Sequence, residues 1–179
     1  MKQAVVILAG GKSSRMGQNK ALLNYRGETF IKSIIHQVEP LGCPIYISGK
    51  QRTYETFGLE IIEDQFADQG PVVALSTCFN AIDADNVLVL SCDVPQITTS
   101  DLRLLVEAHE GDMTMYESDG RKMPLVAIYN RSSFSHFHTS VQRGERRLFS
   151  VLEELKTTVI KYNGVLHNVN TPNDLEKII

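Results

Sequence analysis

Glycines, hydroxyl side chains and cations are concentrated in one short stretch that directly follows an apolar run. The apolar run covers residues 5–8, and residues 8–20 read LAGGKSSRMGQNK. Gly10 and Gly11 have no Cβ, so a polyphosphate can approach the peptide N–H groups closely there. Positive charge for phosphate oxygens comes from Lys12, Arg15 and Lys20. This stretch is therefore predicted to be a phosphate-binding loop.

The spacing of this stretch excludes two widespread phosphate loops. The pattern G-x-x-x-x-G-K-[ST] fails because Gly17 is followed by Gln18, and G-x-G-x-x-G is absent. A glycine turn followed by an exposed basic loop is the structural alternative. Within the stretch, Lys20 is the catalytic candidate that would neutralise an α-phosphate, and Arg15 would do the same for the β- and γ-phosphates. Solvated surface charge is the alternative for both residues.

Two carboxylates follow later apolar runs. Asp93 comes directly after the run at residues 87–90, within Cys92-Asp93-Val94-Pro95, and Asp64 comes after the run at residues 59–62. The carboxyl ends of parallel strands meet at one edge of a sheet, so both could lie near the glycine loop. Magnesium takes one or two protein carboxylates beside substrate phosphates, which makes Asp93 the candidate metal ligand and a catalytic residue. Each carboxylate could instead cap a turn.

No general base is evident in the sequence beside these residues. A hydroxyl or water nucleophile would need one. A phosphate monoester would not, because its second pKa of about 6 leaves it anionic at neutral pH. The residues therefore favour transfer to a phosphate acceptor.

The elements that must position these residues alternate between strands and helices. The first half predicts strands at residues 5–8, 45–47, 59–62 and 87–90, and helices at 30–38, at 51–57 and from Pro71. The second half predicts a helix capped by Ser100, paired strands at 113–116 and 123–129, helices at 132–141 and 148–155, edge strands at 159–162 and 165–169, and a helix capped by Thr171. Apolar strands without polar alternation are typical of a three-layer α/β sandwich with a mainly parallel central sheet.

Composition limits the class of protein. The chain has 179 residues, 42% of them hydrophobic and 22% charged, which suits one globular domain. A net charge of -3 argues against a nucleic-acid-binding protein. The three cysteines lack C-x-x-C spacing, which predicts neither a disulfide framework nor a zinc site. The apolar run at residues 4–9 is too short for a signal peptide and no membrane span is evident, so we expect a cytosolic protein without membrane contact.

The motif L-A-G-G-x-x-x-R-M-G-x-x-K resembles that of nucleotidyltransferases, and most closely that of the molybdenum cofactor guanylyltransferase family. The resemblance spans nearly the whole chain. In order, it continues through Glu63-Asp64, Gly70-Pro71, Cys92-Asp93-Val94-Pro95, Gly144-Glu145-Arg146-Arg147 and Asn168-Val169-Asn170-Thr171-Pro172. It implies a Rossmann-like fold of the nucleotide-diphospho-sugar transferase type. It also implies Mg²⁺-dependent transfer of GMP from GTP to the phosphate of molybdopterin or the molybdenum cofactor, with release of pyrophosphate.

The resemblance also implies residue roles. The nucleotide would be bound by Leu8, Ala9, Gly10, Gly11, Lys20, Asp64 and Asp93, with Asp93 also holding the metal. The acceptor would be bound by Asn168, Asn170 and Arg146. The N-terminal half would thus bind the nucleotide and the C-terminal half the acceptor. Other cofactor-biosynthesis proteins and a GTP-binding accessory protein are the expected partners.

Two departures from the family pattern bear on base choice. Ser48 stands where an asparagine can contact the guanine or ribose, and Ala74 stands where the family often has glycine. Two alternative functions therefore remain at this point. One is a relative that uses CTP or transfers to a sugar phosphate, and the other is a nucleotide-binding regulator without turnover.

Overall fold

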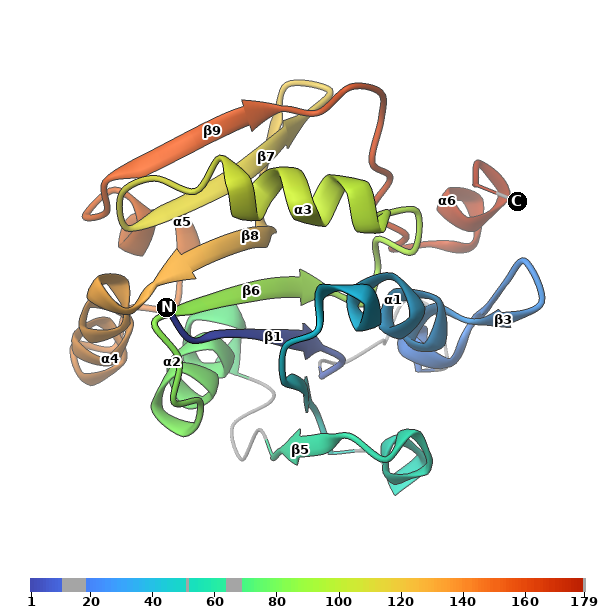
Figure 1. The fold of residues 1–179 in the computed structure, drawn as a ribbon, viewed down its shortest axis with the longest axis horizontal. Helices are drawn as coiled ribbons and strands as arrows, with labels where there is room; N and C mark the ends of the chain where they lie inside the picture. The colour runs from blue at the N-terminus through green and yellow to red at the C-terminus, as the bar shows by residue number, and fades with distance from the viewer. Residues whose placement is uncertain (11–18, 51, 64–68, 179) are drawn as a thin grey trace.

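The computed structural model describes residues 1–10, 19–50, 52–63 and 69–178. Its core is a seven-stranded sheet with the strand order β5-β4-β1-β6-β8-β7-β9 (Figure 1). The strands are β1 (Gln3–Leu8), β4 (Ile45–Ser48), β5 (Glu60–Ile62), β6 (Asn86–Ser91), β7 (Met113–Ser118), β8 (Arg121–Asn130) and β9 (Thr157–Lys161). Strand β8 runs antiparallel to both neighbours, and the other pairs are parallel. The predicted mainly parallel sheet is confirmed.

Helices cover both faces of the sheet because its central strands are apolar on both sides. In β1, Val5 and Ile7 point into one core cluster, whereas Val6 and Leu8 point into the other. The first cluster is covered by α1 (Phe30–Val38) and α3 (Thr99–Glu107), and the second by α2 (Pro71–Ala81), α4 (Phe134–Gln142) and α5 (Leu148–Leu152). The predicted three-layer α/β sandwich is therefore confirmed.

Two predictions about the second half of the chain are wrong. Helix α3 is capped by Thr98 and not by Ser100, because Thr98 and Asp101 form a reciprocal capping box. Residues 165–169 form no strand, since their backbone N–H groups bond elsewhere. Leu166 N donates to Ser118 Oγ at 2.8 Å and Val169 N donates to Asp93 O at 2.9 Å. The predicted β7–β8 hairpin is confirmed, and its turn places Asp119 and Gly120 at positive φ.

A third, smaller core joins distant parts of the chain. The hairpin of β2 (Asn24–Tyr25) and β3 (Glu28–Thr29) lies at the same end of the molecule as α6 (Pro172–Glu176) (Figure 1). Buried side chains from both regions pack together here: Leu23, Tyr25, Phe30, Val169 and Ile178. Apolar burial thus holds the C-terminal segment against the residues that follow Lys20.

Within the described ranges, no helix has both the length and the apolar character needed to cross a bilayer.

Candidate active site

The ends of β1 and β6 bring the two main sequence motifs to one edge of the sheet. The strands pair in parallel with Leu8 opposite Ser91, so both chains leave the sheet side by side. Just beyond, Cys92 N donates to Leu8 O at 3.1 Å. The start of the glycine-rich stretch and Asp93 therefore adjoin, as predicted for the carboxyl edge of a parallel sheet.

Asp93 presents a carboxylate oxygen to which none of the described residues donates a hydrogen bond. Its side chain is 17% exposed, and Oδ2 lies 3.9 Å from Lys20 Nζ. Among the described residues, no group donates a hydrogen bond to the buried Oδ1. Burial raises the pKa of Asp93, and the opposing effects of a hydrogen bond from Ser91 and of the Lys20 charge are smaller. A buried carboxylate in this state favours a bound cation.

The donor set around Asp93 suits a magnesium ion whose shell is completed by substrate phosphates. No cluster of three or more His, Cys, Asp or Glu side chains suited to a metal occurs in the described part of the chain. Magnesium is commonly bound by only one or two carboxylates, and phosphates of the substrate complete its shell. The orphaned oxygen of Asp93 is consistent with that arrangement.

Lys20 links its own short helix to the loop after β6 and to the C-terminal segment. It begins a short 3-10 helix, Lys20–Leu22, whose N-cap Asn19 accepts a hydrogen bond from Ala21 N at 3.0 Å through Oδ1. Its Nζ donates to Asn170 Oδ1 at 2.5 Å and also faces Asp93. The structure therefore brings together Lys20 and Asp93, which were predicted from the residues themselves, and Asn170, which was predicted from the family resemblance.

The C-terminal segment is positioned by its own backbone and by a helix cap. Val169 N bonds to Asp93 O, which ties the segment to the loop after β6. The predicted cap of α6 is confirmed: Asp174 Oδ2 accepts hydrogen bonds from Asn170 N at 3.1 Å, Thr171 N at 3.0 Å and Thr171 Oγ1 at 2.8 Å. Asn168 is exposed, whereas Asn170 is half-buried against Lys20.

Acid should loosen this segment through Asp174. Hydrogen bonds from Thr171 and from the backbone of Asn170 lower the pKa of Asp174 from 3.8 to about 2. Because the folded-state pKa is depressed, its stabilising contribution is complete above pH 3.8 and is lost as the pH falls towards 2. We expect the amide protons of Asn170 and Thr171 to lose protection from hydrogen exchange over that range. An Asp174→Asn variant should show faster exchange already at pH 5 and little further change on acidification; equal protection in both proteins at pH 5 would contradict this role.

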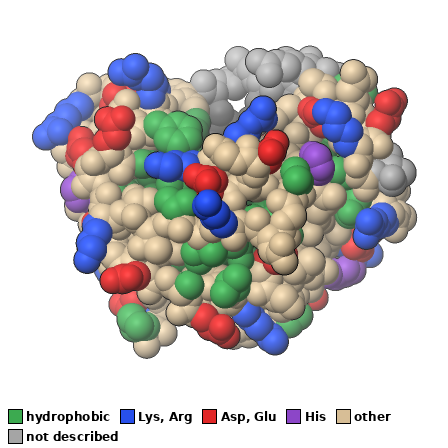
Figure 2. Space-filling model, turned by 90° about the horizontal axis from the view of Figure 1, so that it is seen from above, with side chains coloured by type: hydrophobic (Ala, Val, Ile, Leu, Met, Phe, Trp, Pro, Cys, Tyr) green, Lys and Arg blue, Asp and Glu red, His purple; other side chains and the backbone are tan. Residues whose placement is uncertain are grey.

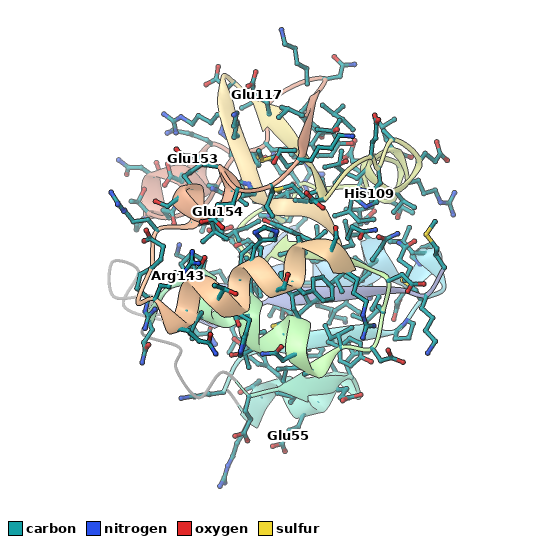
Figure 3. All side chains as sticks on the ribbon, turned by 90° about the vertical axis from the view of Figure 1, so that its left-hand side faces the viewer. Glu55, His109, Glu117, Arg143, Glu153 and Glu154 are labelled. Carbon is teal, nitrogen blue, oxygen red and sulfur yellow. The ribbon has the colours of Figure 1, made fainter. Side chains whose placement is uncertain are left out.

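Arg146 is bonded close to the start of α2. It follows α4, and its guanidinium donates from Nη2 to Gln69 Oε1 at 3.1 Å and from Nη1 to Glu145 O at 3.0 Å. These contacts place it beside the segment that leads into α2. The nearby Arg143, which caps the C-terminal end of α4, is exposed (Figure 3). An acceptor role for Arg146 therefore stays a prediction.

The remaining predicted site residues divide into two groups. Gly11, Arg15 and Asp64 lie outside the described residues. Leu8 and Ala9 are buried, and Ala9 N already donates to Ser48 O at 2.9 Å, whereas Gly10 is exposed. The side chains of Leu8 and Ala9 therefore shape the sheet edge, while Gly10 is open to solvent.

Tyr54 is a residue of this region that the sequence analysis missed. The stretch 51–57 was predicted to be a polar surface helix, and Arg52–Phe57 is indeed a 3-10 helix with Glu55 pointing outwards (Figure 3). Tyr54, however, is fully buried. Its hydroxyl donates to Ala9 O at 2.8 Å and accepts from Asn19 Nδ2 at 2.8 Å. The available signal was a tyrosine in the middle of an otherwise polar run, residues 51–56.

Charge on the molecular surface is mixed. Figure 2 shows Lys and Arg side chains interspersed with Asp and Glu on the face it presents, without one continuous basic area. The candidate site differs from the mixed surface charge because it holds one cation, Lys20, at a defined position.

Comparison with known proteins places the chain among nucleotidyltransferases. A family model described as the MobA-like NTP transferase domain matches residues 5–159. A protein from Carboxydothermus hydrogenoformans, named probable molybdenum cofactor guanylyltransferase, is 30% identical over 98% of this chain and 94% of its own length. Sequence similarity therefore covers both the Lys20–Asp93 region and the C-terminal segment.

Solved structures share the fold at lower identity. Molybdopterin-guanine dinucleotide biosynthesis protein A from Archaeoglobus fulgidus has a TM-score of 0.79 and 20% identity, covering 98% of this chain and 96% of its own. A CMP:2-keto-3-deoxy-manno-octonic acid synthetase complexed with CTP has a TM-score of 0.78 and 15% identity, covering 99% of this chain and 97% of its own. The fold is thus common to proteins named for different nucleotides.

Proposed function

This chain belongs to the MobA-like NTP transferase family, and from that premise we propose that it transfers GMP from GTP to the terminal phosphate of molybdopterin or its molybdenum-loaded form. The observation that carries the proposal is the meeting of Lys20, Asp93 and Asn170 at the carboxyl edge of the sheet. It joins the predicted nucleotide half and the predicted acceptor half of the chain in one site. The products would be molybdopterin guanine dinucleotide and pyrophosphate.

The described residues suit an in-line displacement at the α-phosphorus. An oxygen of the acceptor phosphate forms the new P–O bond while the bond to the β-phosphate oxygen breaks and its electron pair leaves with pyrophosphate. The Lys20 ammonium would bind the α-phosphate oxygens, where negative charge must be stabilised in the transition state. Asp93 would hold Mg²⁺, which when bound supplies charge neutralisation on the triphosphate. The acceptor is already anionic near neutral pH, so no side chain has to remove a proton from it.

Asn170 would position the lysine for this step. Its Oδ1 accepts from Lys20 Nζ, and Val169 N fixes the same segment to Asp93 O. The acceptor-side segment thereby limits where the ammonium can lie. Roles for Gly11, Arg15 and Asp64 in nucleotide binding and for Asn168 and Arg146 in acceptor binding belong to the proposal. So do the cytosolic location, the accessory GTP-binding protein and the other cofactor-biosynthesis proteins as partners.

The choice of base needs a direct test, because the shared fold occurs with CTP as well. Ser48, at the end of β4, and Ala74, within α2, are the departures that make cytosine the second candidate. We expect pyrophosphate release with Mg²⁺, molybdopterin and GTP, and much slower release with CTP or ATP. The product should be identified by mass as the guanine dinucleotide.

Each outcome of this assay has a distinct meaning. Selective turnover with CTP would mean that the protein is a nucleotidyltransferase whose product contains cytosine in place of guanine. Turnover only with a sugar phosphate as acceptor would reject molybdopterin. Tight GTP binding without turnover with any of these acceptors would reject the enzymatic proposal in favour of a nucleotide-binding regulator.

A further inference from the structure

The hydroxyl of Tyr54 joins Ala9 and Asn19, two residues near opposite ends of the glycine-rich stretch. On the near side it donates to Ala9 O, one residue after β1, and on the far side it accepts from Asn19 Nδ2. Both distances are 2.8 Å. One buried oxygen atom therefore fixes Asn19 relative to the end of β1.

We propose that Tyr54 is a positioning residue for Lys20, acting through Asn19. Asn19 uses both ends of its amide: Nδ2 donates to Tyr54, and Oδ1 accepts from Ala21 N as the cap of the helix Lys20–Leu22. Orientation of this amide by Tyr54 thus sets the start of the helix that carries Lys20. The inference rests on the proposed function only in giving Lys20 its task in catalysis.

The tyrosine ring is itself held in one place. Tyr54 is fully buried in the cluster that includes Ala9, Ala21 and Ile47. A Cβ added at Gly49 would lie 2.7 Å from Tyr54 Cε2, which is closer than side-chain contacts allow. The absence of a side chain at Gly49 therefore admits the ring against the strand end. Burial also raises the pKa of the phenol from 10 to about 12.

Loss of the hydroxyl should act on Lys20 and not merely on packing. Phenylalanine would fill the same volume, but Ala9 O would lose its donor and Asn19 Nδ2 its acceptor. The Asn19 amide could then rotate and release its cap on Ala21 N. Lys20 Nζ would no longer be confined to the position 3.9 Å from Asp93 Oδ2 and bonded to Asn170.

A matched control is available in Tyr129. This residue is also fully buried, and its hydroxyl donates to Pro124 O at 2.8 Å. Its aromatic neighbours Phe79 and Phe137 belong to the opposite core cluster from that of Tyr54. Tyr129→Phe therefore reproduces the loss of a buried hydroxyl without affecting Asn19.

The test compares wild type, Tyr54→Phe, Gly49→Ala and Tyr129→Phe by two measurements. The first is the rate of acylation of Lys20 by an N-hydroxysuccinimide ester, followed by peptide mass spectrometry without nucleotide. The second is kcat and KM for GTP in the transfer assay. We expect Lys20 to be acylated several-fold faster in Tyr54→Phe and Gly49→Ala than in wild type. We also expect kcat to fall about tenfold or more, since a small displacement of a catalytic group lowers the rate strongly. Tyr129→Phe should leave both within about twofold of wild type, although its melting temperature falls.

A double substitution tests whether Tyr54 acts through Asn19. If it does, Tyr54→Phe should change Lys20 acylation and kcat little further in an Asn19→Ala background, because coupled residues are not additive. Unchanged Lys20 acylation and kcat in Tyr54→Phe would overturn the proposal, as would full additivity with Asn19→Ala. A wild-type protein without GTP turnover would reject the proposed function alone, because the acylation experiment still decides whether Tyr54 positions Lys20.

Discussion

Replacement of Asp93 by asparagine is expected to abolish transfer while making the nucleotide-free protein more stable. Asparagine has nearly the same shape but no negative charge, so it cannot neutralise a cation at the triphosphate. Loss of several kcal/mol of transition-state stabilisation lowers kcat by about three orders of magnitude. The same change removes a buried charge whose Oδ1 accepts no hydrogen bond from any described residue.

The gain in stability has a definite sign. Burial raises the pKa of Asp93, so the folded protein holds this proton more tightly than the unfolded chain does. Stability from this group is therefore greatest at low pH and falls as the pH rises beyond the ordinary range of a carboxyl. At neutral pH the neutral amide avoids that loss, and we expect the melting temperature in EDTA to rise by about 3 °C for a gain near 1 kcal/mol.

The control for this prediction is Asp83→Asn. Asp83 is exposed and pairs with Lys2 and Arg131 far from the site, so its replacement should affect neither kcat nor the response to Mg²⁺. Thermal denaturation in EDTA and pyrophosphate release would be measured for both variants. An active Asp93→Asn enzyme would remove Asp93 from the mechanism, and a lower melting temperature would show that its charge stabilises the empty site.

Replacement of Lys20 by methionine is expected to lower kcat by about 100- to 1000-fold, which is the cost of removing one preorganised charge at a transition-state oxyanion. Methionine keeps an unbranched, apolar stem, so the loss should be mainly in charge. Lys20 is also the hydrogen-bond donor to Asn170, and its charge opposes the burial effect on Asp93. The pKa of Asp93 should accordingly rise further in the variant.

Separate measurement of kcat and of GTP affinity distinguishes this role from simple attraction of an anion. A transition-state role lowers kcat more than it weakens the dissociation constant for GTP. Lys32→Met is the matched control, since Lys32 is an exposed lysine on α1. A Lys20→Met enzyme with normal kcat and weakened GTP binding would restrict Lys20 to ground-state binding.

Local sequence patterns predicted the sheet edge well because the relevant signals were local. Apolar runs ending at Leu8 and near Asp93 identified strands buried on both faces, and parallel pairing then required their ends to meet. The helix cap formed by Thr171 and Asp174 could be predicted equally well, since both partners lie within four residues of sequence. The shift of the α3 cap from Ser100 to Thr98 is a competition between two nearby hydroxyls.

Contacts between distant residues could not be predicted in the same way. The bond from Lys20 to Asn170 joins positions 150 residues apart, and the bonds of Tyr54 cross 35 and 45 residues. The segment at residues 165–169 has a strand-like composition, yet its N–H groups bond to Ser118 and Asp93 and form no ladder. Tertiary partners, which no local pattern specifies, determined these outcomes.

The small core formed by Leu23, Tyr25, Phe30, Val169 and Ile178 has a consequence for a chain still being synthesised. At about 5–20 residues per second, Asn170 is made roughly 8–30 s after Lys20, and it leaves the ribosome tunnel later still. The nascent chain carries Lys20 through that interval without the Asn170 amide that confines it. Completion of the site is thus delayed until the C-terminal segment can dock, so an unfinished chain lacks the contact that holds Lys20 in place.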